Sequence, residues 1–139
     1  MSCSSSVNCK ALGTDSSGGP TGALIESWNG TVWSVESAAP KGSSGISLAG
    51  VSCISSTDCV AVGDYDTNGQ GTTGETLVES WDGVAWYVTG SPDKGGANFL
   101  SNVSCISSTL CVAVGDHDKR RKVDRTLIET GTASSFNRT

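Results

Sequence analysis

An internal repeat is the feature that most constrains how this chain can fold. Residues 51–66 read V-S-C-I-S-S-T-D-C-V-A-V-G-D-Y-D, and residues 103–118 match them at 14 of 16 positions. A more diverged copy, S-C-S-S-S-V-N-C-K-A-L-G, occupies residues 2–13. Self-similarity at a fixed period of about 50 residues indicates stacked copies of one supersecondary unit. We therefore treat residues 1–139 as a single repeat domain, with repeats at approximately 1–45, 46–97 and 98–139.

Each repeat contains four short segments with the composition of β-strands. In the second repeat these are residues 46–53, 59–63, 77–81 and 86–88, and the first two recur at 99–105 and 111–115. Asn29-Gly30 and Asp82-Gly83 separate the last two segments, and such dipeptides are typical of two-residue type I′ hairpin turns. With 18 Gly and only 17% charged residues, the composition also favours strands and tight turns. The sequence thus predicts an all-β fold of four-stranded antiparallel units.

The period favours a β-propeller, whose blades are four-stranded sheets of about 40 to 50 residues. A β-sandwich is the alternative, but a sandwich does not require its strands to repeat as sequence. About three blades per chain cannot close a ring, because propellers typically have about four to eight blades. We therefore expect either a homo-oligomer, with two copies giving about six blades, or further blades in a longer chain.

The two repeated phrases resemble those of a family of bacterial, often actinobacterial, secreted repeat proteins. The shared pattern is S-C-x-S-x-x-x-C-x-A-V-G followed by T-L-x-E-x-W-x-G-x-x-W, and it extends to Glu129. The resemblance implies a propeller-like architecture and no particular activity. The segment W-D-G-x-x-W at residues 81–86 is also similar to part of small propeller lectins that assemble rings from short chains and bind fucose, although Glu79 departs from the lectin spacing.

The last ten residues depart from the pattern. Residues 126–129 read T-L-I-E as in the other copies, but T-G-T-A-S-S-F then replaces the expected S-W-D/N-G phrase. Codons that encode Thr-Gly-Thr-Ala can encode Trp-Asn-Gly in a shifted frame. This suggests the hypothesis that a change of reading frame has altered the tail and removed further blades. The encoding DNA would test it.

Six cysteines form three pairs with the same spacing, C-x5-C: Cys3 with Cys9, Cys53 with Cys59, and Cys105 with Cys111. A disulfide across each hairpin is the simplest interpretation, stabilising the fold by roughly 2 to 3 kcal/mol each. Zinc is the alternative, but structural zinc sites usually use C-x2-4-C pairs with further ligands. Disulfides indicate an oxidising compartment, so we expect a secreted protein. The N-terminus lacks a signal segment, which suggests that Met1 begins an excised piece.

The stretch of residues 64–75 matches the calcium-loop pattern D-x-[DN]-x-[DN]-G-x5-E. It predicts a calcium site, with calcium as the one candidate cofactor. The alternative is an ordinary solvent-exposed turn, because Asp, Asn and Gly are common in turns, and the other repeats do not keep the pattern. The predicted ligands are Asp64, Asp66, Asn68, Gln70 and Glu75.

A glutamate and a tryptophan recur on the third predicted strand, as Glu26 with Trp28 and as Glu79 with Trp81, and Glu129 continues the series. An indole can stack on the apolar face of a sugar while a carboxylate binds its hydroxyl groups, so these residues are candidate carbohydrate ligands. The alternative is structural, with the glutamates accepting hydrogen bonds from the adjacent blade and the tryptophans filling space between blades.

Catalysis finds little support in the sequence. There is a single histidine, His117, in a predicted loop beside the basic run at residues 119–122, and no G-x-S-x-G motif. A net charge of −5 disfavours nucleic acid as a partner, and no apolar run is long enough to span a membrane. We therefore predict a non-catalytic recognition or scaffold module that binds carbohydrate or a surface partner. The alternative is a calcium-dependent hydrolase of lactones, esters or glycans, with Asp64, Asp66 and Glu75 holding the metal on the propeller axis.

Overall fold

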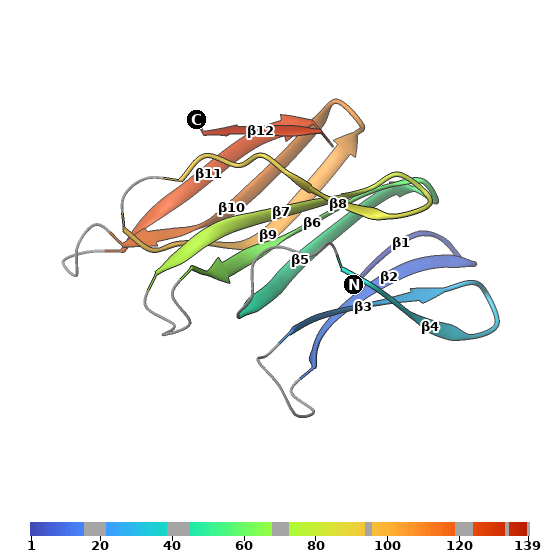
Figure 1. Cartoon of the computed structure of the whole chain (residues 1–139). Helices are drawn as coiled ribbons and strands as arrows, with labels where there is room; N and C mark the ends of the chain where they lie inside the picture. The colour runs from blue at the N-terminus through green and yellow to red at the C-terminus, as the bar shows by residue number, and fades with distance from the viewer. Residues whose placement is uncertain are drawn as a thin grey trace.

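A computed structural model describes residues 1–15, 22–38, 45–67, 73–93, 96–118, 124–132 and 134–138. Within these ranges the chain forms three four-stranded antiparallel sheets and no helix, so the predicted all-β fold is confirmed (Figure 1). None of the described segments is a helix long and apolar enough to cross a membrane. The first sheet comprises β1 (Ser2–Ser5), β2 (Asn8–Asp15), β3 (Gly22–Trp28) and β4 (Trp33–Glu36).

The second and third sheets repeat this arrangement. The second comprises β5 (Ile46–Ser55), β6 (Asp58–Asp66), β7 (Gly74–Trp81) and β8 (Trp86–Thr89), and the third β9 (Asn98–Ser107), β10 (Leu110–Asp118), β11 (Asp124–Thr132) and β12 (Ser135–Arg138). In every sheet the strands lie in sequence order, each paired with the next. The predicted strands are thus confirmed, and several extend by a few residues beyond the predicted ends.

All six cysteines form the three predicted disulfides, Cys3–Cys9, Cys53–Cys59 and Cys105–Cys111. Each bond joins residues that face one another on the first and second strands of a sheet. No cysteine is free, so the zinc alternative is wrong.

The three sheets stack face to face around two apolar clusters. On β6, Val60 and Val62 pack against the third sheet, whereas Cys59 and Ala61 pack against the first. This alternation is the consequence of strand geometry, in which successive side chains point to opposite faces. The second sheet is therefore covered on both faces, while the first and the third each have one covered face and one open face.

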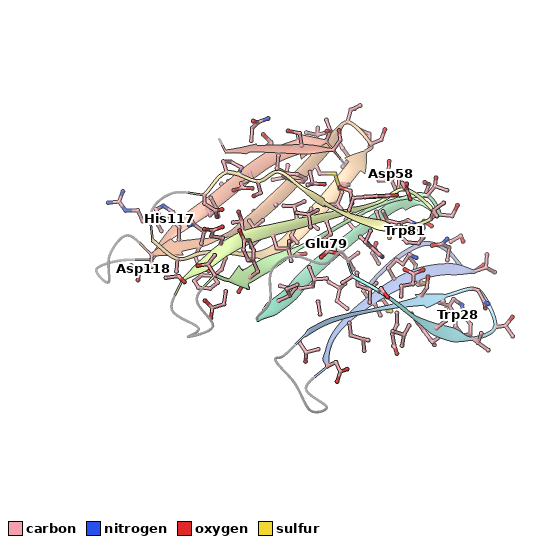
Figure 2. All side chains as sticks on the ribbon, in the orientation of Figure 1. Trp28, Asp58, Glu79, Trp81, His117 and Asp118 are labelled. Carbon is pink, nitrogen blue, oxygen red and sulfur yellow. A yellow bond between two sulfur atoms is a disulfide. The ribbon has the colours of Figure 1, made fainter. Side chains whose placement is uncertain are left out.

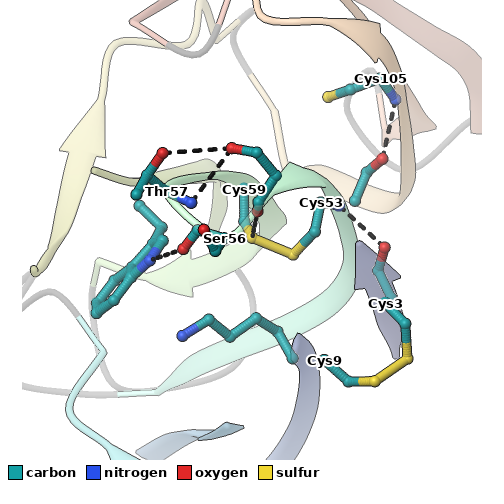
Figure 3. The surroundings of a disulfide bond; sticks show 12 residues. Cys3, Cys9, Cys53, Ser56, Thr57, Cys59 and Cys105 are labelled. Carbon is teal, nitrogen blue, oxygen red and sulfur yellow. Dashed lines mark hydrogen bonds between the residues drawn. A yellow bond between two sulfur atoms is a disulfide. The ribbon is translucent and has the colours of Figure 1, made fainter. Parts of the chain in front are cut away.

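The first strands of neighbouring sheets are linked by side-chain hydrogen bonds. The Cys53 amide donates a hydrogen bond to Ser2 Oγ (2.9 Å), and the Cys105 amide donates one to Ser52 Oγ (3.0 Å) (Figure 3). A Cβ atom on Gly50 would lie only 2.7 Å from Asn102 Cα, so glycine is needed where β5 meets β9. The sheets are thus joined along their first strands, and the same serine makes the link each time.

The predicted two-residue hairpin turn is wrong, because the loop has four residues. Trp28 pairs with Trp33 and Trp81 with Trp86, which leaves residues 29–32 and 82–85 between the strands. Asn29 Oδ1 accepts hydrogen bonds from two backbone amides of this loop, both at 3.0 Å. Gly30 takes the positive φ of 93°. The Asn/Asp-Gly signal therefore located the hairpin correctly, but the side-chain acceptor supports a wider loop.

The off-pattern tail still forms a fourth strand. Gly131 pairs with Phe136 in the same register in which Trp81 pairs with Trp86. Phe136 is 3% exposed and packs with the apolar cluster between the second and third sheets. Phe136 thus takes the place of Trp86 in the third sheet, and Gly131 takes the place of Trp81. The reading-frame hypothesis itself stays a prediction.

Candidate functional site

A buried ion pair fills the interface between the first and second sheets. Lys10 Nζ lies 2.7 Å from both carboxylate oxygens of Glu36 and 2.8 Å from Ser27 Oγ. The same ammonium lies 3.9 Å from the ring centroid of Trp81, and Trp86 Nε1 donates to Glu36 Oε2 at 3.2 Å. One face of the Trp81 indole is therefore covered by a cation from the first sheet.

The corresponding space between the second and third sheets is an open cleft. Its volume is about 610 Å³. Hydroxyl, carboxylate and aromatic side chains from β5 to β8 and the loops between these strands line it, together with one residue of the β11–β12 turn. Asp58 and Trp81 are the two lining residues labelled in Figure 2. The lining residues are Ser55, Thr57, Asp58, Ser80, Trp81, Asp82, Tyr87, Val88, Thr89, Gly90 and Ser134.

Register explains why this interface is open and the other is filled. Gly131 occupies the place of Trp81, so no indole reaches from the third sheet into the space above the second. Val60 and Thr89 stand where the first sheet has Lys10 and Glu36, so the ion pair is also missing. The cleft therefore lies where the repeat would otherwise place a tryptophan.

Two carboxylates line the cleft. Asp58 is partly exposed there, although its Oδ1 atom is buried and, like Asn8 Oδ1 at the equivalent position of the first sheet, has no hydrogen-bond partner within the described ranges. The amides of Ala85 and Val84 donate to Asp82 (2.9 and 2.8 Å) and, with the Tyr87 hydroxyl, lower the pKa of that carboxyl. Tyr87 is 55% exposed, so its ring is open to solvent at the cleft. The cleft thus combines an aromatic ring with charged acceptors.

Of the four predicted ligand residues, only Trp81 lines the cleft. Glu79 is fully buried. Its counterpart Glu129 accepts a hydrogen bond from Ser91 Oγ (2.6 Å), which belongs to the segment after β8. Glu26 and Trp28 lie on the open face of the first sheet, away from the cleft, because their neighbour Ile25 packs between the first and second sheets. The structure therefore does not gather the repeated glutamates and tryptophans into one site.

Sequence reasoning missed Asp58, Tyr87 and Thr89. These residues carry no shared repeat signal, because the first sheet has Asn8, Ser34 and Glu36 at the equivalent positions. The signal that could have found them is the departure from the repeat at Gly131, which predicts an unfilled space opposite these positions.

The strand alternation separates the predicted calcium ligands. Glu75 pairs with Tyr65 and shares its face of the second sheet, and the Tyr65 hydroxyl donates a hydrogen bond to Glu75. Asp64 and Asp66 lie on the opposite face, where the Thr73 hydroxyl donates to Asp66 at 3.3 Å. Asn68 and Gln70 lie outside the described residues. Nowhere in the described part of the chain do three or more acidic, histidine or cysteine residues form a group suited to a metal.

Asp64 should make stability depend on pH. Burial, Asp116 and Asp66, in that order of effect, raise the pKa of Asp64 from 3.8 to about 6. Because the folded state holds this proton more tightly, wild-type stability should fall as pH rises from about 4 to about 6. Asp64→Asn lacks the titrating carboxyl, so its stability should not show this loss. The Tm of the variant minus the Tm of the wild type should therefore be larger at pH 7 than at pH 4. An unchanged difference between the two pH values would contradict the assignment.

His117 differs from its predicted environment. It lies on β10 and is only 7% exposed, so the prediction of a loop histidine is wrong. The strand continues three residues beyond the point where the repeat pattern predicts its end, because β10 stays paired with β9 as far as His117 and with β11 as far as Asp118. The basic run at 119–122 lies outside the described residues.

No protein family, no curated protein and no solved structure matches the chain.

Proposed function

We propose that the chain is a segment of a β-propeller that acts as a recognition module and binds carbohydrate in the cleft between its second and third sheets. Three consecutive four-stranded antiparallel sheets, joined along their first strands, support the propeller architecture. The three disulfides support a location outside the cell.

The lining of the cleft is the observation that carries the ligand class. Tyr87 offers a ring on which the apolar face of a sugar can stack. Asp58 and Asp82 offer carboxylate acceptors for sugar hydroxyls, and charge-assisted hydrogen bonds of this kind are the stronger ones. Ser80 and Thr89, whose hydroxyls lie 2.8 Å apart, add neutral donors and acceptors to the floor. A few polar groups beside an aromatic ring are typical of small-ligand sites.

Replacing Asp58 with alanine should weaken carbohydrate binding about tenfold or more, because a hydrogen bond to a charged group contributes about 1.5 to 3 kcal/mol. A glycan array would identify a ligand, and calorimetric titration of that glycan would measure the affinities. The matched control is Asn8→Ala, at the equivalent position of the first sheet, where Lys10, Glu36 and Trp81 fill the interface. This control should bind as wild type does. Equal loss in both variants, or no glycan bound by the wild type, would contradict the proposal.

A chimera tests the location of the ligand independently. Residues 130–136 would be replaced by S-W-D-G-V-A-W, the sequence of residues 80–86. A tryptophan at position 131 should then occupy the cleft as Trp81 occupies the other interface, and carbohydrate binding should be lost while Tm rises. Retained binding in a folded chimera would show that the ligand binds elsewhere.

The calcium-dependent hydrolase finds less support than the recognition module. Glu75 and the pair Asp64 and Asp66 lie on opposite faces of the second sheet, so the described residues do not converge on one ion. Ester or lactone hydrolysis that a chelator abolishes would favour this alternative.

A further inference from the structure

We propose that two copies of the chain associate head to tail, with the open face of the first sheet of one copy packed on the open face of the third sheet of the other. A pair joined in this way at both ends would form a closed ring of six sheets, within the range of about four to eight that propellers use. This inference rests on surfaces away from the cleft and does not depend on the ligand.

The open faces expose residues whose counterparts inside the chain are buried. Val114 and Ile128 on the third sheet are 41% and 43% exposed. Their equivalents on the second sheet, Val62 and Val78, are fully buried by the third sheet. The third sheet therefore presents to solvent the same apolar surface that the second sheet covers with its neighbour.

The first sheet presents the matching half of the same interface. Trp33 is 43% exposed, whereas its equivalent Trp86 is 4% exposed because the first sheet covers it. Trp28 and Trp33 already form the tilted pair seen for Trp81 and Trp86, with 5.6 Å between ring centroids in each case. The surface that would be buried is thus preorganised before the second copy binds, which reduces the entropy lost on association.

A shallow cavity adjoins the place where β1 of the second copy, which begins at Ser2, would start. It has a volume of about 150 Å³ and opens on the third sheet. Its lining residues are equivalent to Gly50, Val51, Ser52, Val60 and Val62 of the second sheet, of which Val60 and Val62 pack against the third sheet. The lining residues themselves are Asn102, Val103, Ser104, Val112 and Val114.

A repeated hydrogen bond specifies the register of this contact. Ser2 accepts from the Cys53 amide and Ser52 accepts from the Cys105 amide, as Figure 3 shows. Ser104 is the next serine in this series, and it is exposed. The amide that continues the series is that of Cys3 in the second copy. This continuity with two interfaces inside the chain is why the occupant is a second copy and not an unrelated partner.

The oligomeric state in solution tests the proposal. Sedimentation equilibrium of the full chain should give twice the mass of 14.1 kDa. Ile128→Arg on the third sheet and Trp33→Glu on the first should each weaken association at least tenfold, with circular dichroism confirming that both variants fold. Val84→Arg is the matched control, since Val84 is 83% exposed on a hairpin loop and belongs to neither face. A monomeric wild type, or a loss of association in the control, would overturn the proposal.

Mixing the two variants distinguishes head-to-tail packing from packing of identical faces. Ile128→Arg keeps an intact first sheet, and Trp33→Glu keeps an intact third sheet, so the mixture should form a heterodimer through one interface. If only one of the two substitutions disrupts the dimer, or if the mixture stays monomeric, the head-to-tail arrangement is wrong.

Discussion

Replacing Glu36 with alanine should destabilise the fold by about 3 kcal/mol, because it leaves the buried Lys10 ammonium without its carboxylate partner. Lys10 is almost completely buried, with its side chain 3% exposed, and both Glu36 oxygens lie 2.7 Å from its ammonium. Without Glu36, the ammonium keeps only the Ser27 hydroxyl and the face of Trp81, which do not neutralise its charge. Trp86 also loses the acceptor for its indole N–H.

Replacing Lys10 instead of Glu36 should destabilise the fold less. Lys10→Val leaves Glu36, whose side chain is 21% exposed and can be solvated in part. The matched control is the double variant Lys10→Val/Glu36→Thr, which reproduces the residues Val60 and Thr89 that the second sheet has at these positions. Because this variant leaves no buried charge without a partner, it should be more stable than Glu36→Ala by about 2 kcal/mol. Urea unfolding measures all three, and a double variant less stable than Glu36→Ala would contradict the role assigned to the pair.

The order and type of the strands could be predicted because the same strand-forming segments recur in the same order in each repeat. The disulfides could be predicted for the same reason, since Cys53 with Cys59 and Cys105 with Cys111 keep one spacing beside a repeated strand. Features that occur in only one of the three repeats could not be predicted from the repeat pattern. Lys10 appears once, with Val60 and Val112 at its equivalents, and its burial depends on Trp81 of the next sheet.

The cleft is a second feature that the repeat pattern alone did not predict. The tail after Glu129 looked like the end of the pattern, so nothing predicted that Phe136 would pack in the place of Trp86. The β10–β11 ladder continues through Gly131, and this register brings Phe136 into the core whatever its neighbours are. The absence of a side chain at Gly131 then opens the space that Trp81 fills elsewhere. The strand pairing is therefore needed to show that Gly131 and Phe136 are the residues that take the places of Trp81 and Trp86.

A second large effect is expected at Gly63, where alanine should destabilise the fold by about 3 kcal/mol. Gly63 lies on β6 opposite Leu48, next to the irregularity in the β5–β6 pairing between Leu48 and Gly50. A Cβ atom there would overlap the carbonyl oxygen of Ser47 and lie 2.9 Å from Leu48 Cα. Because both neighbours are backbone atoms held in the ladder, neither can move without breaking hydrogen bonds of β5.

Gly13→Ala is the matched control, at the equivalent position of the first sheet. A Cβ atom on Gly13 would meet only the Leu24 side chain, at 3.7 Å or more, which is ordinary van der Waals contact. Since alanine restricts the unfolded chain more than glycine does, this variant should be neutral or more stable by up to about 1 kcal/mol. The two substitutions are chemically identical and differ only in whether a first strand lies alongside. Opposite signs in urea unfolding would therefore attribute the cost at Gly63 to the backbone of β5, whereas equal losses in both variants would attribute it to the glycine's own conformation.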